Sequence, residues 1–177
     1  MPATKKPSKV WCWPEHLITL VTLNGNSFLL KIQRATQISA SQIENKADWD
    51  KSLSLIQHWL FDLGGEVCIP NYHLLQPICI EFLEKEIDHM NESLPMLKEF
   101  ILPSGSLACS YAHQARAVCR RAERTLMSVH SRDQNIQATA LQLLNRLSDW
   151  FFVASRALQR AEGGSEVLWQ KNINETI

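Results

Sequence analysis

The stretch Arg116-Ala117-Val118-Cys119-Arg120-Arg121-Ala122-Glu123-Arg124 places four arginines within nine residues of a chain whose formal net charge is zero. It lies inside residues 106–144, which contain neither proline nor glycine, so the sequence predicts a helix there. At 3.6 residues per turn, Arg116, Arg120 and Arg124 lie along one face of that helix.

This arginine face has two interpretations. Like charges one turn apart repel, so the stacking favours an anionic ligand such as a polyphosphate, whose oxygens match the guanidinium fork. Arg121 lies beside the face, and Glu123 lies one turn from Arg120. The alternative is a solvated face neutralised by Glu123 and by acids on a neighbouring helix. The spacing alone leaves both open.

Three further helices are predicted on either side of this stretch. The first runs from about Ala47 and ends at Gly64-Gly65, with an apolar face of Trp49, Leu53, Ile56, Leu60 and Leu63. The second begins near Pro77 and is kinked or ended by Pro95, with an apolar face of Leu83, Ile87, Met90, Leu94 and Leu97. The third runs from about Ile136 to Ala161, and Gly163-Gly164 stops it; its buried face is Leu143, Leu144, Leu147, Trp150, Phe151, Ala154 and Leu158.

The loops and ends of the chain complete the prediction. The arginine helix spans roughly 106–129, with Ser104 or Ser106 as its N-cap. Residues 167–169 are expected to pack back on the bundle, residues 1–14 to be irregular, and residues 15–35 are ambiguous between strand and helix. The fold class is therefore all-α, an up-and-down bundle of four or five helices.

Composition limits the possible functions. The chain has 177 residues, of which 45% are hydrophobic and 20% charged, which is typical of one globular domain. Zero net charge argues against a nucleic-acid binder, and no run of residues approaches the length of a membrane span. Neither a signal peptide nor a phosphate-binding glycine loop is apparent.

The five cysteines indicate a reducing compartment. Their number is odd and none forms a Cys-x-x-Cys pair, so neither a disulfide framework nor a zinc site is predicted. We expect reduced thiols and a cytoplasmic protein. His113 lacks a Glu-x-x-His pattern, so no metal site is predicted there either.

Two further residues have competing interpretations. Asn145 shares a helix face with Asp149 and is a mediocre helix former, which suggests that its amide has a role; the alternative is a buried amide bonded to a facing helix. Phe100 precedes a proline-bounded loop, and the sequence alone favours a simple core residue.

Seven segments together resemble one known family, the PduO-type ATP:cob(I)alamin adenosyltransferases. The resemblance covers roughly residues 50–170 and is carried, in order, by residues 56–66, 82–88, 94–95, 100–105, 113–116, 119–124 and 144–149. Residues 163–169, Gly-Gly-Ser-Glu-Val-Leu-Trp, are similar to the family's ending.

The resemblance implies a ferritin-like five-helix bundle, assembled as a homotrimer with active sites between subunits. The reaction it implies is transfer of the 5′-deoxyadenosyl group of ATP to the cobalt of reduced cobalamin, with release of triphosphate. ATP, Mg²⁺ and cobalamin are the implied ligands; a flavin reductase and an adenosylcobalamin-dependent enzyme are possible partners.

The resemblance also implies roles for particular residues. The implied ATP contacts are Arg120, Arg121, Glu123, Arg124 and Asn145, with Arg120 and Arg116 catalytic. Arg116 would form an ion pair across the subunit interface. Phe100 would bind cobalamin at the lower face of the corrin ring, displacing the axial base.

Residues 1–35 depart from the family pattern, whereas residues 36–177 form the expected bundle domain. The Thr/Gly-rich phosphate-binding segment is missing, and Leu23 stands where an aspartate belongs if Asn26-Ser27 is the end of the next motif. Three explanations remain open: an active enzyme with a divergent ATP loop, a catalytically impaired paralogue that binds corrinoid or nucleotide, or an altered N-terminus on a standard enzyme.

Overall fold

The structure is a computed structural model, and it describes residues 46–69, 71–132 and 136–172. The expectations for residues 1–35, including the missing phosphate-binding segment, and for Cys12 lie outside the described residues.

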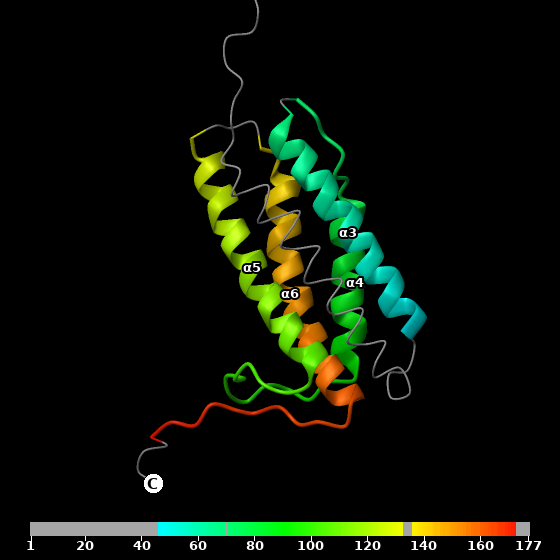
Figure 1. Cartoon of the computed structure of the whole chain (residues 1–177), viewed down its shortest axis with the longest axis vertical. Coiled ribbons are helices and arrows are strands. Elements are labelled where there is room, and N and C mark those ends of the chain that lie inside the picture. The colour runs from blue at the N-terminus through cyan, green and yellow to red at the C-terminus, as the bar shows by residue number, and fades with distance from the viewer. Residues whose placement is uncertain (1–45, 70, 133–135, 173–177) are drawn as a thin grey trace, which may run out of the picture.

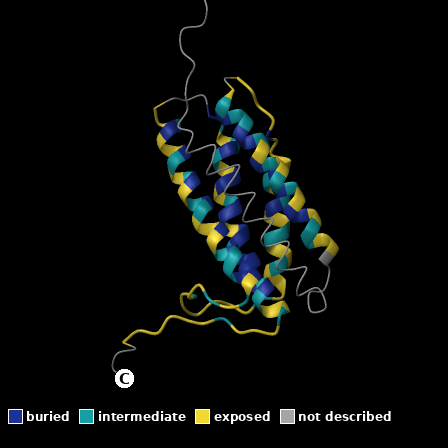
Figure 2. Ribbon diagram, in the orientation of Figure 1, coloured by how far each residue is buried: buried dark blue, intermediate teal, exposed yellow. Residues whose placement is uncertain are grey.

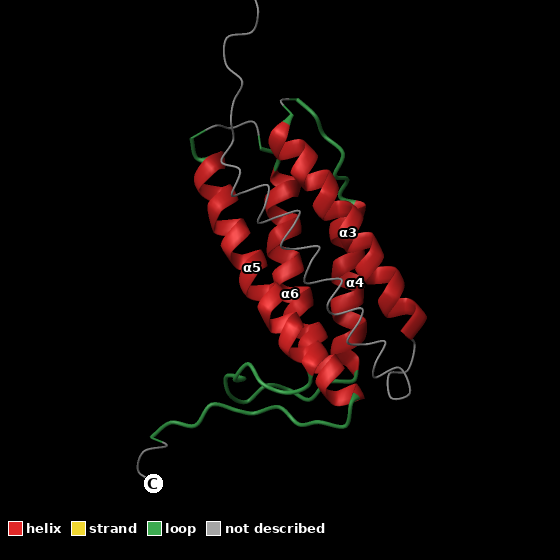
Figure 3. Cartoon of the chain, viewed as in Figure 1, coloured by secondary structure: helices red, strands yellow, loops and turns green. Residues whose placement is uncertain are grey.

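Within the described residues four helices form an up-and-down bundle, which confirms the predicted all-α fold class (Figures 1 and 3). In chain order they are α3 (Lys46–Cys68), α4 (Ile78–Glu92), α5 (Leu107–His130) and α6 (Ala138–Ala161). Loop 93–106 and the tail that follows α6 lie together at one end of the bundle (Figure 1). Within the described ranges, no helix is long and apolar enough to cross a lipid bilayer.

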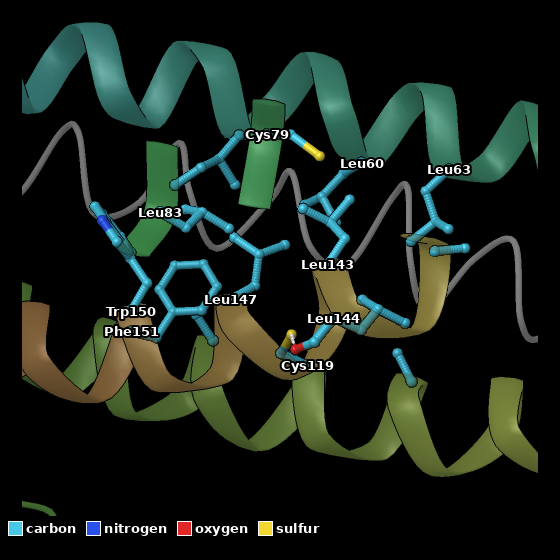
Figure 4. Close-up of a cluster of buried hydrophobic side chains, with 14 of the residues drawn as sticks. Leu60, Leu63, Cys79, Leu83, Cys119, Leu143, Leu144, Leu147, Trp150 and Phe151 are labelled. Carbon is cyan, nitrogen blue, oxygen red and sulfur yellow. Dashed lines mark hydrogen bonds between the residues drawn. The ribbon is translucent and has the colours of Figure 1, made fainter. Parts of the chain in front are cut away.

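Helix α6 contributes the largest share of the core, and it lies between α5 and α4 (Figure 1). Burial follows one stripe of each helix, as the helical spacing predicts (Figure 2). Trp150 packs edge-to-face with Trp49 of α3, with the ring centroids 5.9 Å apart, and with Phe151, with the ring centroids 5.3 Å apart. All seven residues predicted for the buried face of α6 are buried, and five of them are seen packing together in Figure 4.

Helix α5 buries a face of small residues against α6. That face consists of Ala108, Cys109, Ala112, Ala115, Cys119, Ala122, Leu126 and Val129. Because alanine has a short side chain, the two helices can approach closely. The Cys119 thiol donates a hydrogen bond to the Leu144 carbonyl oxygen across this contact at 3.1 Å (Figure 4). Ser106 is the N-cap, as predicted, and accepts a hydrogen bond from the Cys109 backbone N–H.

The predicted end of the first helix is wrong. Helix α3 continues through Gly64-Gly65 to Cys68, and neither glycine has a positive φ. The physical reason at Gly65 is close approach: a Cβ there would lie 3.3 Å from the Tyr72 ring.

The second predicted helix is shorter than its apolar pattern suggests. Helix α4 ends at Glu92, so Leu94 and Leu97 do not continue its buried face, and Leu97 is exposed. Pro95 disfavours helical geometry for the residue before it, which explains why the helix ends ahead of the proline.

Leu147→Ala should destabilise the bundle by about 2–5 kcal/mol, the usual cost of truncating a fully buried leucine. Leu147 has no exposed surface, whereas Leu107 at the start of α5 is 55% exposed. Chemical denaturation of both alanine variants would test this, with Leu107→Ala as the control. Similar midpoints for the two variants would contradict the assigned core.

Candidate functional site

The centre of the site is the carboxylate of Glu123, which joins α5 to α6. One oxygen of Glu123 pairs with the Arg120 guanidinium one turn earlier, and the other accepts a hydrogen bond from Asn145 Nδ2 at 2.9 Å. The close packing of α5 on α6 beside Cys119 and Ala122 brings the Asn145 amide within reach of Glu123. A guanidinium and an amide, separated by 25 residues in sequence, are thereby fixed by a single carboxylate.

This arrangement leaves the side-chain amide oxygen of Asn145 available to a ligand. A carboxylate can only accept hydrogen bonds, so Asn145 must present its NH₂ group to Glu123. Among the described residues its Oδ1 atom has no hydrogen-bond donor, so it can accept a hydrogen bond from a ligand hydroxyl or amino group. The prediction that Asn145 is bonded to a facing helix is therefore right, but the residue is exposed rather than buried.

A cavity of about 360 Å³ opens beside this linkage. It is lined from three helices, by Ile80 and Glu84 of α4, Glu123 and Met127 of α5, and Leu141, Gln142, Asn145 and Arg146 of α6. Its size falls within the range of small-molecule sites, and its lining combines apolar walls with a few polar groups.

The two other central arginines are exposed and have no carboxylate neighbour. Arg121 and Arg124 lie on the solvent side of α5. Within the described ranges, the structure contains no ion pair from either residue to an acid. The alternative interpretation was that Glu123 and acids on a neighbouring helix neutralise the arginine face. Glu123 does pair with Arg120, but within the described ranges no acid of a neighbouring helix pairs with Arg120, Arg121 or Arg124.

Arg116 is separate from the Glu123 linkage. Its guanidinium carbon lies 4.9 Å from the centre of the Phe152 ring, a cation–π contact with α6. Burial, together with the positive charge of Arg116, lowers the pKa of the neighbouring His113 below its ordinary value. His113 is therefore neutral near pH 7, and this end of the face carries the charge of Arg116 alone.

Phe100 lies at the end of the bundle and not at the Glu123 linkage. It belongs to loop 93–106, and its side chain is 80% exposed, so the expectation of a core residue is wrong. Arg120 lies about 20 Å along α5 from the start of the helix, at about 1.5 Å per residue. A single subunit thus keeps the aromatic side chain and the arginine site apart.

The sequence analysis did not predict one ion-pair group. Arg146 pairs with Glu84 of α4 and with Asp149, each at 3.2 Å. Arg146 therefore links α4 to α6 beside the cavity. Asp149 forms its ion pair with Arg146 and, within the described residues, no hydrogen bond with Asn145. The i,i+3 spacing of Arg146 and Asp149 could have suggested their pair, whereas the pair with Glu84 joins two helices and has no local spacing signal.

The four described cysteines do not supply a nucleophile. Among the described residues all four are free thiols, and burial raises the pKa of each one, that of Cys109 to about 11. A thiol with a raised pKa is protonated at neutral pH and unreactive. In the same part of the chain, no group of three or more His, Cys, Asp or Glu side chains could hold a metal ion.

Comparisons with known proteins agree with this architecture. The family model described as cobalamin adenosyltransferase matches residues 24–158. A cobalamin adenosyltransferase of Cupriavidus metallidurans is 52% identical over 116 residues, covering 66% of this chain and 62% of the relative. A corrinoid adenosyltransferase of Bacillus subtilis is 40% identical over 129 residues, covering 71% of this chain and 66% of the relative. The chain thus spans slightly less than two thirds of the length of these curated relatives.

A solved structure with the same fold also supports this family. A variant PduO-type ATP:corrinoid adenosyltransferase from Lactobacillus reuteri, complexed with cobalamin and ATP, superposes with a TM-score of 0.76 at 28% identity. The match covers 90% of this chain and 88% of that one. By the family model, the curated relatives and the shared fold, this chain belongs to the cobalamin adenosyltransferase family and to its PduO-type group.

Proposed function

We propose that this chain transfers the 5′-deoxyadenosyl group of ATP to the cobalt of a reduced corrinoid, releasing triphosphate. The observation that carries the proposal is the Glu123 carboxylate, which binds both Arg120 and Asn145, and which with Asn145 lines a cavity of about 360 Å³. The relative from Lactobacillus reuteri, whose structure contains ATP and cobalamin, supports these ligands.

ATP is held by the central arginines and by the amide in this proposal. Arg120, Arg121 and Arg124 bind the triphosphate, since guanidinium groups present paired donors to phosphate oxygens. Asn145 accepts a hydrogen bond from the nucleoside through its free oxygen, and Glu123 keeps Arg120 and Asn145 in fixed orientations.

In this reaction the protein positions the two substrates and stabilises the negative charge that develops on the leaving triphosphate. The electron pair of Co(I) forms the Co–C5′ bond, and the C5′–O5′ bond breaks with its electrons leaving on triphosphate. Negative charge therefore grows on the bridging oxygen, where arginine donors stabilise the transition state more than the ground state. No protein nucleophile or base is required, which is consistent with the protonated cysteines.

Phe100 is the proposed contact for the lower face of the corrin ring. An exposed aromatic ring there takes the place of the axial base and keeps water from the metal, which makes Co(II) easier to reduce. Its exposure of 80% leaves the whole ring available to such a partner.

The active unit is proposed to be a homotrimer. Phe100 and Arg120 are far apart in one subunit, so a site at a subunit interface would bring the two kinds of residue together. Arg116 is exposed and has no acidic partner within the described ranges, which leaves it free to pair with a neighbouring subunit's acid. It is the second residue that we propose to be catalytic, through the assembly of that site.

Mg²⁺ is proposed to arrive on the triphosphate. The described residues offer no cluster of acidic or histidine ligands that could bind it independently. This fits an ion that keeps several waters and binds through substrate phosphates. Charge neutralisation of the leaving triphosphate is what it would supply.

The proposal also includes a compartment, the cytoplasm, and two partner enzymes. Free thiols at four described cysteines support a reducing compartment such as the cytoplasm. A flavin reductase that supplies the reduced corrinoid and an enzyme that uses adenosylcobalamin are the partners that this chemistry requires.

An anaerobic assay tests the proposal. Chemically reduced cobalamin, MgATP and this chain should give loss of the Co(I) absorbance and formation of adenosylcobalamin. Corrinoid or nucleotide binding without turnover would instead favour the impaired paralogue or the altered N-terminus. A chain that binds neither substrate would contradict the proposed function altogether.

A further inference from the structure

The C-terminal end of α6 carries a buried arginine that ties two loops together. Arg156 is 6% exposed, and its Nε donates to Glu166 Oε1 at 2.5 Å. Its Nη2 donates to the Pro95 carbonyl oxygen at 2.6 Å. One side chain therefore links the beginning of loop 93–106 to the tail that follows α6.

Gln159, one turn later on α6, makes a second tie between the same two segments. Its Oε1 accepts a hydrogen bond from the Ser106 backbone N–H at 2.9 Å, and its Nε2 donates to the Ser165 carbonyl oxygen at 3.3 Å. A Cβ at Gly105 or at Gly164 would lie within about 2.1 Å of this amide. The Gln159 amide can therefore occupy this position only because both residues are glycines.

The segments held by these ties pair with one another through their backbones. Trp169 N–H donates to the Phe100 carbonyl oxygen at 2.7 Å, and Leu102 N–H donates to the Val167 carbonyl oxygen at 2.8 Å. Ile101 and Leu168 form an antiparallel bridge between them. The predicted return of residues 167–169 thus ends on the Phe100 loop, and their side chains stay exposed.

Phe100 depends on this backbone pairing for its position. Its ring is 80% exposed, so packing within the subunit does not orient it. Where a side chain lacks packing, its direction follows the backbone that carries it. That backbone is fixed by hydrogen bonds to the tail, and the tail is fixed by Arg156 and Gln159.

We propose that Arg156, Gln159 and Glu166 are positioning residues that set the Phe100 ring against the corrin. We name this group the tail clamp. The inference rests on the proposed function, since it assigns Phe100 the lower face of that substrate. Removing an axial ligand from cobalt demands a ring held in one place, and a displacement of about 1 Å at a reacting centre can cost 100-fold in rate.

Gln159→Ala is the primary test, because it removes the two hydrogen bonds of Gln159, to Ser106 and to Ser165, without leaving a buried charge. We expect kcat to fall roughly tenfold, while the KM for ATP changes by less than about twofold. The proportion of bound Co(II)-corrinoid in the four-coordinate state, measured by electron paramagnetic resonance, should fall with kcat. Arg160→Ala is the matched control, since Arg160 is an exposed neighbour on the same helix.

Glu166 supplies a second pair of variants. Glu166→Gln keeps an oxygen that can accept from Arg156 Nε and should retain most of the four-coordinate signal. Glu166→Ala removes that acceptor and should lose the signal. Thermal unfolding of each variant, followed alongside, identifies any variant that does not fold.

A double-mutant cycle separates positioning from a general structural effect. In a Phe100→Ala background, Gln159→Ala should lower kcat by less than about twofold, because the ring to be positioned is already gone. Multiplicative effects of the two substitutions, or an unchanged four-coordinate signal in folded Gln159→Ala, would overturn the tail clamp.

The two proposals can fail separately. A wild-type chain without adenosyltransferase activity contradicts the proposed function. An active wild type with independent Gln159 and Phe100 effects contradicts the tail clamp alone.

Discussion

Arg120→Ala is expected to lower kcat/KM for adenosyl transfer by about 100- to 1,000-fold, the usual cost of removing one donor from a charge-stabilising site. Among the described residues, Arg120 is the one arginine of α5 that an ion pair fixes, through Glu123. A fixed donor stabilises developing phosphate charge without reorganising during the reaction. Steady-state kinetics under anaerobic conditions would measure the loss.

The fold should tolerate this substitution. The Arg120 side chain is 44% exposed, and Glu123 keeps its hydrogen bond to Asn145 when the arginine is removed. Arg120→Lys keeps the charge without the planar fork and should give an intermediate rate. Arg132→Ala is the control, because that arginine is exposed and its side chain donates a hydrogen bond to the Ser128 carbonyl oxygen at 3.1 Å. A folded Arg120→Ala protein with wild-type turnover would contradict the assigned role.

Phe100→Ala should reduce turnover by at least about tenfold, which corresponds to about 1.4 kcal/mol of lost transition-state stabilisation. Alanine cannot fill the lower axial position, so the corrin base or water can remain on cobalt and Co(II) becomes harder to reduce. Binding of ATP should be unchanged, since the Glu123 linkage lies on another part of the bundle. Turnover and the four-coordinate Co(II) signal, measured with the same samples, would test both statements.

Phe61→Ala is a close control for this experiment. Phe61 of α3 is 71% exposed, so the substitution removes a similar amount of exposed aromatic surface away from loop 93–106. Both variants should unfold at nearly the wild-type temperature, because neither ring is part of the core. Equal losses of turnover for the two variants would show that the effect of Phe100→Ala is not specific to the corrin contact.

Local patterns were enough to predict the helices but not all of their ends. The buried stripe of α6 and the N-cap at Ser106 follow from spacing and from short-range hydrogen bonding. Gly64-Gly65 has the composition of a helix end, yet α3 continues through it, with neither glycine at a positive φ. The close approach of the Tyr72 ring accounts for a glycine at position 65 without a helix end there.

The candidate site, like the helices, was predicted only in part from the sequence. The arginine spacing left an anionic ligand and a neutralised surface both open, and the motif resemblance named the residues that would bind ATP. Neither could predict that one carboxylate holds Arg120 and Asn145 together, or that Arg146 pairs with Glu84 of α4. These partners come from different helices or compete for the same group, so their pairing depends on how the helices pack.

By itself, the sequence determined an all-helical bundle, an arginine-rich face on its third described helix, and the family to which the chain belongs. Periodicity, capping residues and ordered motifs are properties of neighbouring residues, so they can be read along the chain. Only the tertiary structure decided that Phe100 is exposed and that Arg156 and Gln159 fix its loop to the tail. Those contacts join residues 53 and 61 positions apart, and they exist only because packing of α6 brings both segments to one end of the bundle.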